Sequence, residues 1–144
     1  MRQSVISIVI AGFVILLPGC KTQTGPDSDN HVLVEGVWHG TLDSADLVVT
    51  FIEGEFEGAP TVSGSAYLNT TTQGRAFLIG SGTHNRADSL WFSLFPIPAT
   101  GKESYLLRGD VHAGWIHGSF QRFDSSGQSV GSGSWEVGRA WERS

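Results

Sequence analysis

The sequence predicts an all-β fold: an eight-stranded antiparallel up-and-down barrel that follows an N-terminal export signal and a short disordered tether. Three observations carry this prediction. From Val37 onward, apolar and polar residues alternate with a period of two, without a 3.6-residue period. Clusters of Gly, Pro, Asn, Asp and Ser interrupt the alternation at short intervals. A pattern with a central glycine recurs within the alternating segments.

The alternation divides the chain into eight expected strands, separated by turn-forming residues. The strands are 37–42, 47–52, 62–68, 75–83, 90–95, 104–111, 115–123 and 130–139. The gaps contain DSAD, EGAP, NTTTQG, HNRADS, PIPATGK and SSGQS. Because these residue types favour turns, each gap is expected to reverse the chain between neighbouring antiparallel strands.

The recurring pattern is apolar, any residue, Gly, any residue, apolar. It appears as VSGSA, LRGDV and IHGSF, and as GSGSW with a leading glycine. Glycine weakens a strand unless it allows strong coiling or leaves room for a large neighbour. Two-residue turns at 113–114 and 126–127 would place Gly118 between Gly109 and Trp135. Large residues then face glycines, as expected in a sheet that curves and closes.

An even number of strands with short connections favours a closed barrel, which has no exposed edges. A two-sheet sandwich is the alternative, but its Greek-key crossings usually need longer connections. The inward positions are Trp38, Leu42, Leu47, Val49, Phe51, Leu68, Phe92, Leu94, Tyr105, Leu107, Phe120 and Trp135. An eight-stranded barrel is filled by side chains or holds one small ligand, and these bulky residues predict a largely filled interior with at most a shallow mouth.

Residues 1–19 have the pattern of a secretory signal peptide. Met1 and Arg2 supply positive charge, and the apolar run from Val5 to Leu17 has 13 residues. A membrane-spanning helix needs about 20 residues, so this run indicates a signal peptide instead. Cys20, the only cysteine, follows directly in the stretch LPGC.

LPGC resembles the lipobox of bacterial lipoproteins, in which a peptidase cuts before the cysteine and the cysteine receives acyl chains such as palmitate. The resemblance implies lipidation of Cys20. Residues 21–30 are polar, contain Gly and Pro and lack large apolar side chains, so residues 20–30 are expected to form a flexible tether before a barrel domain over residues 31–144. Lys21 implies sorting to the outer membrane, facing the periplasm or the surface. The alternatives are an ordinary cleaved signal with a free thiol and an uncleaved hydrophobic segment.

The charge distribution limits the partners. The chain has a net charge of −5, with nine Lys and Arg, 14 Asp and Glu, and no basic run. A nucleic-acid partner is therefore not expected. The expected partner is the membrane, through the lipid anchor on Cys20, and no cofactor is expected.

The ends of the predicted barrel carry a second resemblance. Gly36-Val37-Trp38 opens the first strand and Arg139 closes the last. This arrangement is similar to that of the calycin group, which includes lipocalins, avidins and fatty-acid-binding proteins. In that group a basic residue of the last strand covers a Trp of the first. The resemblance implies that Trp38 and Arg139 stack and close one end, and that the barrel binds a small apolar ligand.

The histidines do not predict a metal site. His112 and His117 are expected on opposite faces of one hairpin, and His39 faces outward. His31 is placed in the tether region and His84 in a loop. No three ligands converge in this interpretation, so no metal is expected.

Two further groups contain residue types that serve in catalysis or in metal binding. Asp110, His117 and Ser119 share one face of a hairpin, like an orienting carboxylate, base and nucleophile, but that face is convex and has no pocket. Glu53, Glu55 and Glu57 are expected to form a solvated acidic hairpin tip. No catalytic residue is predicted, and the protein is expected not to be an enzyme.

Two functions remain nearly equal on the sequence. In the first, the interior binds a small apolar ligand, faced by Phe51, Phe92, Tyr105, Phe120 and Trp135. In the second, a solid barrel contacts another envelope protein through its outer surface or through the apolar loop 95–98.

Overall fold

The computed structural model describes residues 32–85, 87–98 and 103–140, in which all regular structure is β-strand. The strands are β1 (Gly36–Leu42), β2 (Ala45–Phe56), β3 (Ala59–Asn69), β4 (Gly74–His84), β5 (Ser89–Ile97), β6 (Ser104–His112), β7 (Trp115–Phe123) and β8 (Ser129–Arg139). All eight predicted strands are present. The largest differences are in β2 and β3, which continue to a tight turn at Glu57 and Gly58.

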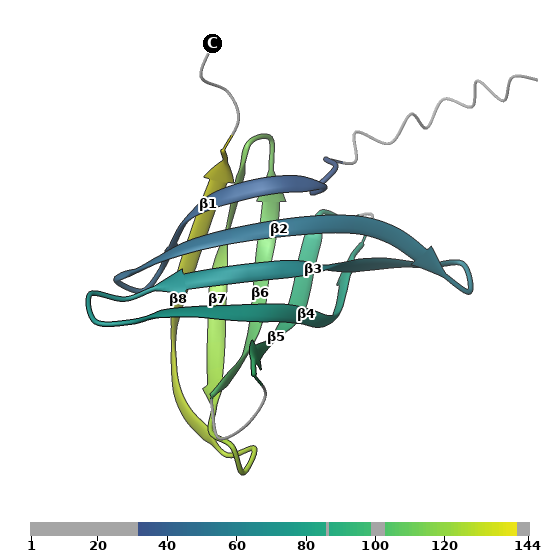
Figure 1. The fold of residues 1–144 in the computed structure, drawn as a ribbon. Coiled ribbons are helices and arrows are strands. Elements are labelled where there is room, and N and C mark those ends of the chain that lie inside the picture. The colour runs from purple at the N-terminus through teal and green to yellow at the C-terminus, as the bar shows by residue number, and fades with distance from the viewer. Residues whose placement is uncertain (1–31, 86, 99–102, 141–144) are drawn as a thin grey trace, which may run out of the picture.

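The strands form one closed barrel in chain order, with every neighbour antiparallel and β8 paired to β1. The predicted up-and-down topology is therefore confirmed and the sandwich alternative is wrong. In Figure 1, β1 to β4 run across β5 to β8, and the β2–β3 hairpin projects beyond the other strands.

The predicted registers of the last three strands are confirmed. Gly118 pairs with Gly109 on β6 and with Trp135 on β8. The second turn differs from the prediction, because residues 125–127 form a three-residue loop and Val130 is left out of the pairing as a bulge. The extra loop residue and the bulge cancel, so the register is the one that a two-residue turn would give.

Close backbone approach explains why Gly118 and Gly109 are glycines. A Cβ atom at Gly118 would overlap the carbonyl oxygen of Arg108. A Cβ at Gly109 would lie 2.9 Å from the ring of Trp135, which occupies this space. The indole also donates from Nε1 to the Arg108 carbonyl oxygen at 3.0 Å. Large and small residues thus interlock across three strands, as the glycine pattern predicted.

The barrel interior is the hydrophobic core. All twelve side chains predicted to face inward are buried. Val34, which precedes β1, is also fully buried in this cluster. The segment before β1 therefore contributes to the core, which the strand pattern did not predict.

The two ends of the barrel have different surroundings. One end holds the start of β1, the β4–β5 loop, the β6–β7 turn and the end of β8. Residues 32–35 lie at this end, which we call the plugged end. The other end, which we call the mouth, holds the β1–β2, β3–β4, β5–β6 and β7–β8 connections.

Candidate functional site

The plugged end is closed by residues 32–35 together with Trp38 and Arg139. The Arg139 guanidinium lies 4.7 Å from the centre of the Trp38 ring, so the expected stacking is present. Arg139 also donates to the backbone carbonyls of Leu33 and Glu35. The Trp38 indole donates to the Val34 carbonyl at 2.6 Å. These contacts hold the segment against the end of β8.

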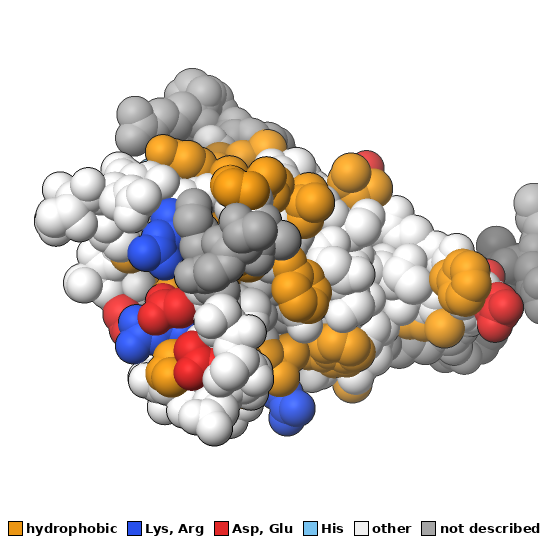
Figure 2. All heavy atoms as spheres, turned by 60° about the horizontal axis from the view of Figure 1, so that its bottom comes forward, with side chains coloured by type: hydrophobic (Ala, Val, Ile, Leu, Met, Phe, Trp, Pro, Cys, Tyr) orange, Lys and Arg blue, Asp and Glu red, His pale blue; other side chains and the backbone are white. Residues whose placement is uncertain are grey.

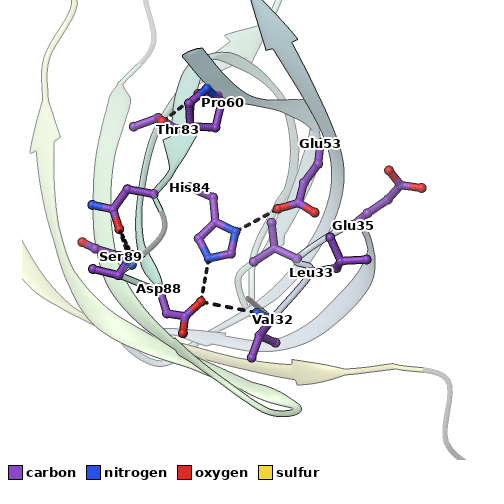
Figure 3. A network of polar contacts seen from close by, with 12 residues as sticks. Val32, Leu33, Glu35, Glu53, Pro60, Thr83, His84, Asp88 and Ser89 are labelled. Atoms are coloured by element: carbon purple, nitrogen blue, oxygen red, sulfur yellow. Dashed lines mark hydrogen bonds and ion pairs between the residues drawn. The ribbon is translucent and has the colours of Figure 1, made fainter. Parts of the chain in front are cut away.

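A buried histidine holds the same segment on the opposite side. The expectation that His84 lies in a loop is wrong: it ends β4 with 2% of its surface exposed. Its Nδ1 lies 2.8 Å from Glu53 Oε1, and its Nε2 lies 3.6 Å from Asp88 Oδ1. Asp88 Oδ1 also accepts from the Val32 amide at 3.4 Å (Figure 3). Because β8 and the β4–β5 loop are on opposite sides of the barrel, residues 32–35 span the opening.

The middle of the barrel is filled by aromatic rings in edge-to-face contact. The centroid distances are 5.1 Å for Phe51–Phe92, 5.5 Å for Phe92–Trp135, 5.6 Å for Phe77–Tyr105 and 5.9 Å for Tyr105–Phe120. Of the five residues expected to face a ligand, Phe51, Phe92 and Trp135 pack against one another in this core. Only Tyr105 and Phe120 reach the space at the mouth.

The mouth contains a pocket of about 220 Å³. Its apolar lining comes from Leu42, Ala45, Leu68, Tyr105 and Phe120. Its other lining residues are Asp43, Ser44, Thr70, Arg122, Gly131 and Ser132. Pockets that hold drug-sized molecules are roughly 300–1,000 Å³, so this pocket suits a smaller ligand. The pocket is the shallow mouth that the filled interior leaves.

Charged side chains gather at the lip of this pocket. The Oε2 atom of Glu103 lies 3.7 Å from Arg75 Nη1 and 3.8 Å from Arg122 Nη1. The three side chains are each about one third or more exposed, so solvent weakens these ion pairs. Arg122 also passes over Gly131, where a Cβ would lie 3.2 Å from its Nη2 atom.

Tyr105 joins the apolar floor to this charged lip. Burial raises the pKa of its hydroxyl above 10.0, and the nearby Glu103 carboxylate raises it further, while Arg122 and Arg75 act in the opposite direction. The hydroxyl therefore keeps its proton at neutral pH and is a hydrogen-bond donor beside the Arg122 guanidinium.

Comparisons with protein-family models, curated proteins and solved structures find no match. The candidate site therefore rests on the geometry of this chain. In the part of the chain that the structure describes, no helix has the length and hydrophobicity needed to cross a bilayer. Cys20, the segments expected to form a signal peptide and a tether, and His31 lie outside the described residues.

The expected placement of the hairpin histidines is wrong. His112 and His117 are on the same outer face, with their rings stacked at a centroid distance of 5.3 Å. The chain reverses at the β6–β7 turn, so even positions on β6 and odd positions on β7 share a face. His39 is exposed, as expected. Among the described residues, no group of three or more His, Cys, Asp or Glu could hold a metal ion.

The three residues that resemble a catalytic triad in the sequence lie on the exposed outer face. Asp110 pairs with His117 across the hairpin, and Ser119 pairs with Arg108. Within residues 103–140, no hydrogen bond or ion pair joins Asp110, His117 and Ser119. All three side chains are exposed to solvent.

The three glutamates of the β2–β3 hairpin have different surroundings. Glu55 and Glu57 are exposed near the tip, as expected. Glu53 instead turns toward the barrel and contacts His84. The alternating sequence therefore does not place the three carboxylates together.

The outer surface of β3 to β5 carries apolar side chains. Tyr67, Leu78, Trp91, Phe95 and Ile97 are 40% to 53% exposed. Leu78 and Phe95 are directly paired, and they belong to neighbouring strands β4 and β5. Figure 2 shows hydrophobic side chains in several separate patches on one face of the molecule. Residues 95–97 were expected in a loop but form the end of β5.

Proposed function

We propose that this chain is a lipid-anchored, non-enzymatic lipoprotein of the bacterial cell envelope whose calycin-like barrel binds a small, mainly apolar ligand at its mouth. The observation that supports ligand binding is the 220 Å³ pocket with Tyr105 and Phe120 in its floor. Two aromatic side chains of the barrel interior line this opening.

The sequence supports the lipid anchor. The charged start, the short apolar run and the LPGC junction occur in the order of a lipoprotein signal. Several acyl chains on Cys20 would hold the protein firmly, because each buried CH₂ contributes about 0.8 kcal/mol. Lys21 favours the outer membrane as the location.

The anchor and the pocket would lie at opposite ends of the domain. The described chain begins at Val32, which contacts Asp88 at the plugged end. The pocket opens at the mouth, beyond the aromatic core. In this proposal the tether reaches the barrel from the plugged end, so a ligand approaches from the side away from the anchor.

Native mass spectrometry with organic extraction tests the ligand proposal. Residues 21–144 are expressed in the periplasm without the lipid, and a small molecule is expected to accompany the protein in a one-to-one ratio. Ala45→Phe should reduce its occupancy, because Ala45 lines the pocket. Ala59→Phe is the matched control, since Ala59 is exposed at the β2–β3 turn. A bare mass for the unmodified protein would count against ligand binding.

A protein-interaction function is the second candidate, supported by the apolar outer face of β3 to β5. Part of this face has another explanation, because Tyr67 lies over Gly74 and Phe95 lies over Gly80. Aromatic rings that cover strand glycines stabilise a sheet without any partner. Leu78 covers no such glycine and is therefore the better probe of an interface.

Crosslinking in intact cells distinguishes this candidate. Leu78→Lys should abolish a specific crosslinked product if the outer face binds a protein. Ser119→Lys is the matched control, because Ser119 is exposed on β7, outside the face formed by β3 to β5. If no specific product forms, or if both variants retain it equally, the outer face is not the interface.

A further inference from the structure

At Arg122, the lip of the mouth pocket carries two guanidinium groups against one carboxylate, and Asp43 adds a second carboxylate in the pocket lining. Arg75 and Arg122 share the single Glu103 carboxylate oxygen, at 3.7 Å and 3.8 Å. Charge-assisted hydrogen bonds are shorter, about 2.7–2.9 Å. Two guanidinium groups and one carboxylate leave one positive charge among these three side chains. Arginine stays charged at all relevant pH values, so this imbalance persists.

Two hydrogen-bond donors meet on that wall at the edge of the apolar floor. Arg122 and Tyr105 both line the pocket. The guanidinium carries a fork of N–H donors that matches a carboxylate, and the protonated phenol supplies one more donor. A buried apolar surface beside such donors is complementary to a molecule with an anionic head and an apolar body.

The pocket also limits the size of that body. The space is about 220 Å³. Beneath it, Tyr105 contacts Phe77 and Phe120 edge to face, at 5.6 Å and 5.9 Å between centroids. These rings fill the path into the barrel, so a long acyl chain has no channel to follow. A short alkyl group or a single ring is the appropriate size.

We propose that the mouth binds a small monocarboxylate with a compact apolar body, the carboxylate on Arg122 and Tyr105 and the body against the apolar floor. This inference rests on the proposed ligand binding at the mouth and adds the chemical class of the ligand.

Asp43 provides an internal test of the charge argument. It lines the same pocket, and its Oδ1 accepts from the Ser134 amide at 3.3 Å. The negative charge of its carboxylate repels an anionic ligand in the pocket. Asparagine keeps the acceptor oxygen and tolerates the left-handed backbone of this position, where φ is 51°. Asp43→Asn should therefore strengthen binding of a carboxylate but leave binding of a neutral molecule unchanged.

The experiment compares benzoate with benzamide, which has nearly the same shape without the charge. The full chain is purified in a neutral detergent, and saturation-transfer NMR titrations give both dissociation constants. Benzoate should bind at least roughly tenfold more tightly, which corresponds to about 1.4 kcal/mol. Arg122→Gln should remove this preference. Arg122→Lys should retain part of it, because lysine keeps the charge and loses the fork. Hexanoate tests the same head group on a flexible body.

Controls separate loss of binding from loss of folding. Each variant is checked by circular dichroism and thermal unfolding, and His39→Gln serves as a control on the exposed outer face. The inference is overturned if neither carboxylate binds, or if Arg122→Gln folds and keeps the preference for benzoate. Equal binding of benzoate and benzamide also overturns it, while leaving a neutral ligand, and so the proposed function, in place. If no ligand binds in this test and none accompanies the protein in native mass spectrometry, the carboxylate inference and the proposed ligand-binding function are both wrong.

Discussion

Replacing His84 with alanine tests whether polar contacts keep the plugged end closed. The ring is 2% exposed, with Glu53 Oε1 2.8 Å from one nitrogen and Asp88 Oδ1 3.6 Å from the other. A hydrogen bond to a charged group contributes about 1.5–3 kcal/mol, and removing a buried ring adds the cost of the space left behind. Glu53 keeps some contact with water, which reduces the loss. We expect His84→Ala to lower the free energy of unfolding by about 2–4 kcal/mol.

Urea and thermal unfolding, followed by circular dichroism, measure this change. A loss of this size should lower Tm by about 10–20 °C in a domain of about 100 residues. His39→Ala, at an exposed site, should change stability by less than about 0.5 kcal/mol. A double-mutant cycle with Glu53→Gln should give a coupling energy of about 0.5–3 kcal/mol. The reasoning is refuted if His84→Ala resembles His39→Ala, or if the two mutations are additive.

Three further predictions concern the barrel and its two ends. Gly118→Ala should destabilise the protein by about 1–3 kcal/mol in urea unfolding, because its Cβ meets backbone. Gly54→Ala, which meets only the end of a side chain, should cost less, and equal effects would contradict the packing argument. Arg139→Gln should lower stability by about 1–3 kcal/mol and change the tryptophan emission, since it loses the indole contact and hydrogen bonds to two backbone carbonyls. The emission should recover in part with Arg139→Lys, and an unchanged Tm in both variants would exclude the stacking as a stabilising contact. The pKa of Tyr105 is raised in the folded protein, so the folded state favours the neutral phenol. The contribution of this group to the free energy of unfolding is therefore complete below pH 10 and is lost as pH rises through the folded pKa. Tyr105→Phe should remove this alkaline loss of stability, and a pH profile like that of the unmodified protein would contradict the assignment.

The strand order and the register were predictable because their signals are local in sequence. Each strand pairs with its chain neighbour, so turn residues and period-two alternation identify both partners of every hairpin. Glycine positions indicate the register, since Trp135 occupies the space that Gly109 leaves and the backbone of β6 lies close to Gly118. The β7–β8 register was right although the turn was not, because the bulge at Val130 compensates the longer loop.

His84 was missed because a bulge changes which residues of β4 face inward. Phe77 and Ile79 are buried before the irregularity at Gly80, and His84 is buried after it, so odd positions give way to even ones. Strict alternation would have placed His84 outward, and the turn-forming residues that follow it favoured a loop. The position of a bulge depends on packing around the closed barrel, which the local alternation does not encode.

The same reasoning explains why the two ends, where function is to be sought, were the least predictable parts. The plug joins Val32 to Asp88 and Glu35 to Arg139, pairs separated by 56 and 104 positions in the sequence. The pocket likewise joins Leu42 to Phe120, from strands that are not neighbours in the barrel. No periodic pattern specifies such contacts, because they exist only once the sheet has closed. The period-two alternation and the glycine pattern predict the wall of the barrel, whereas the two ends are built from contacts of single residues such as Arg122 and His84. Tests of function should therefore change those residues and leave the repeats intact.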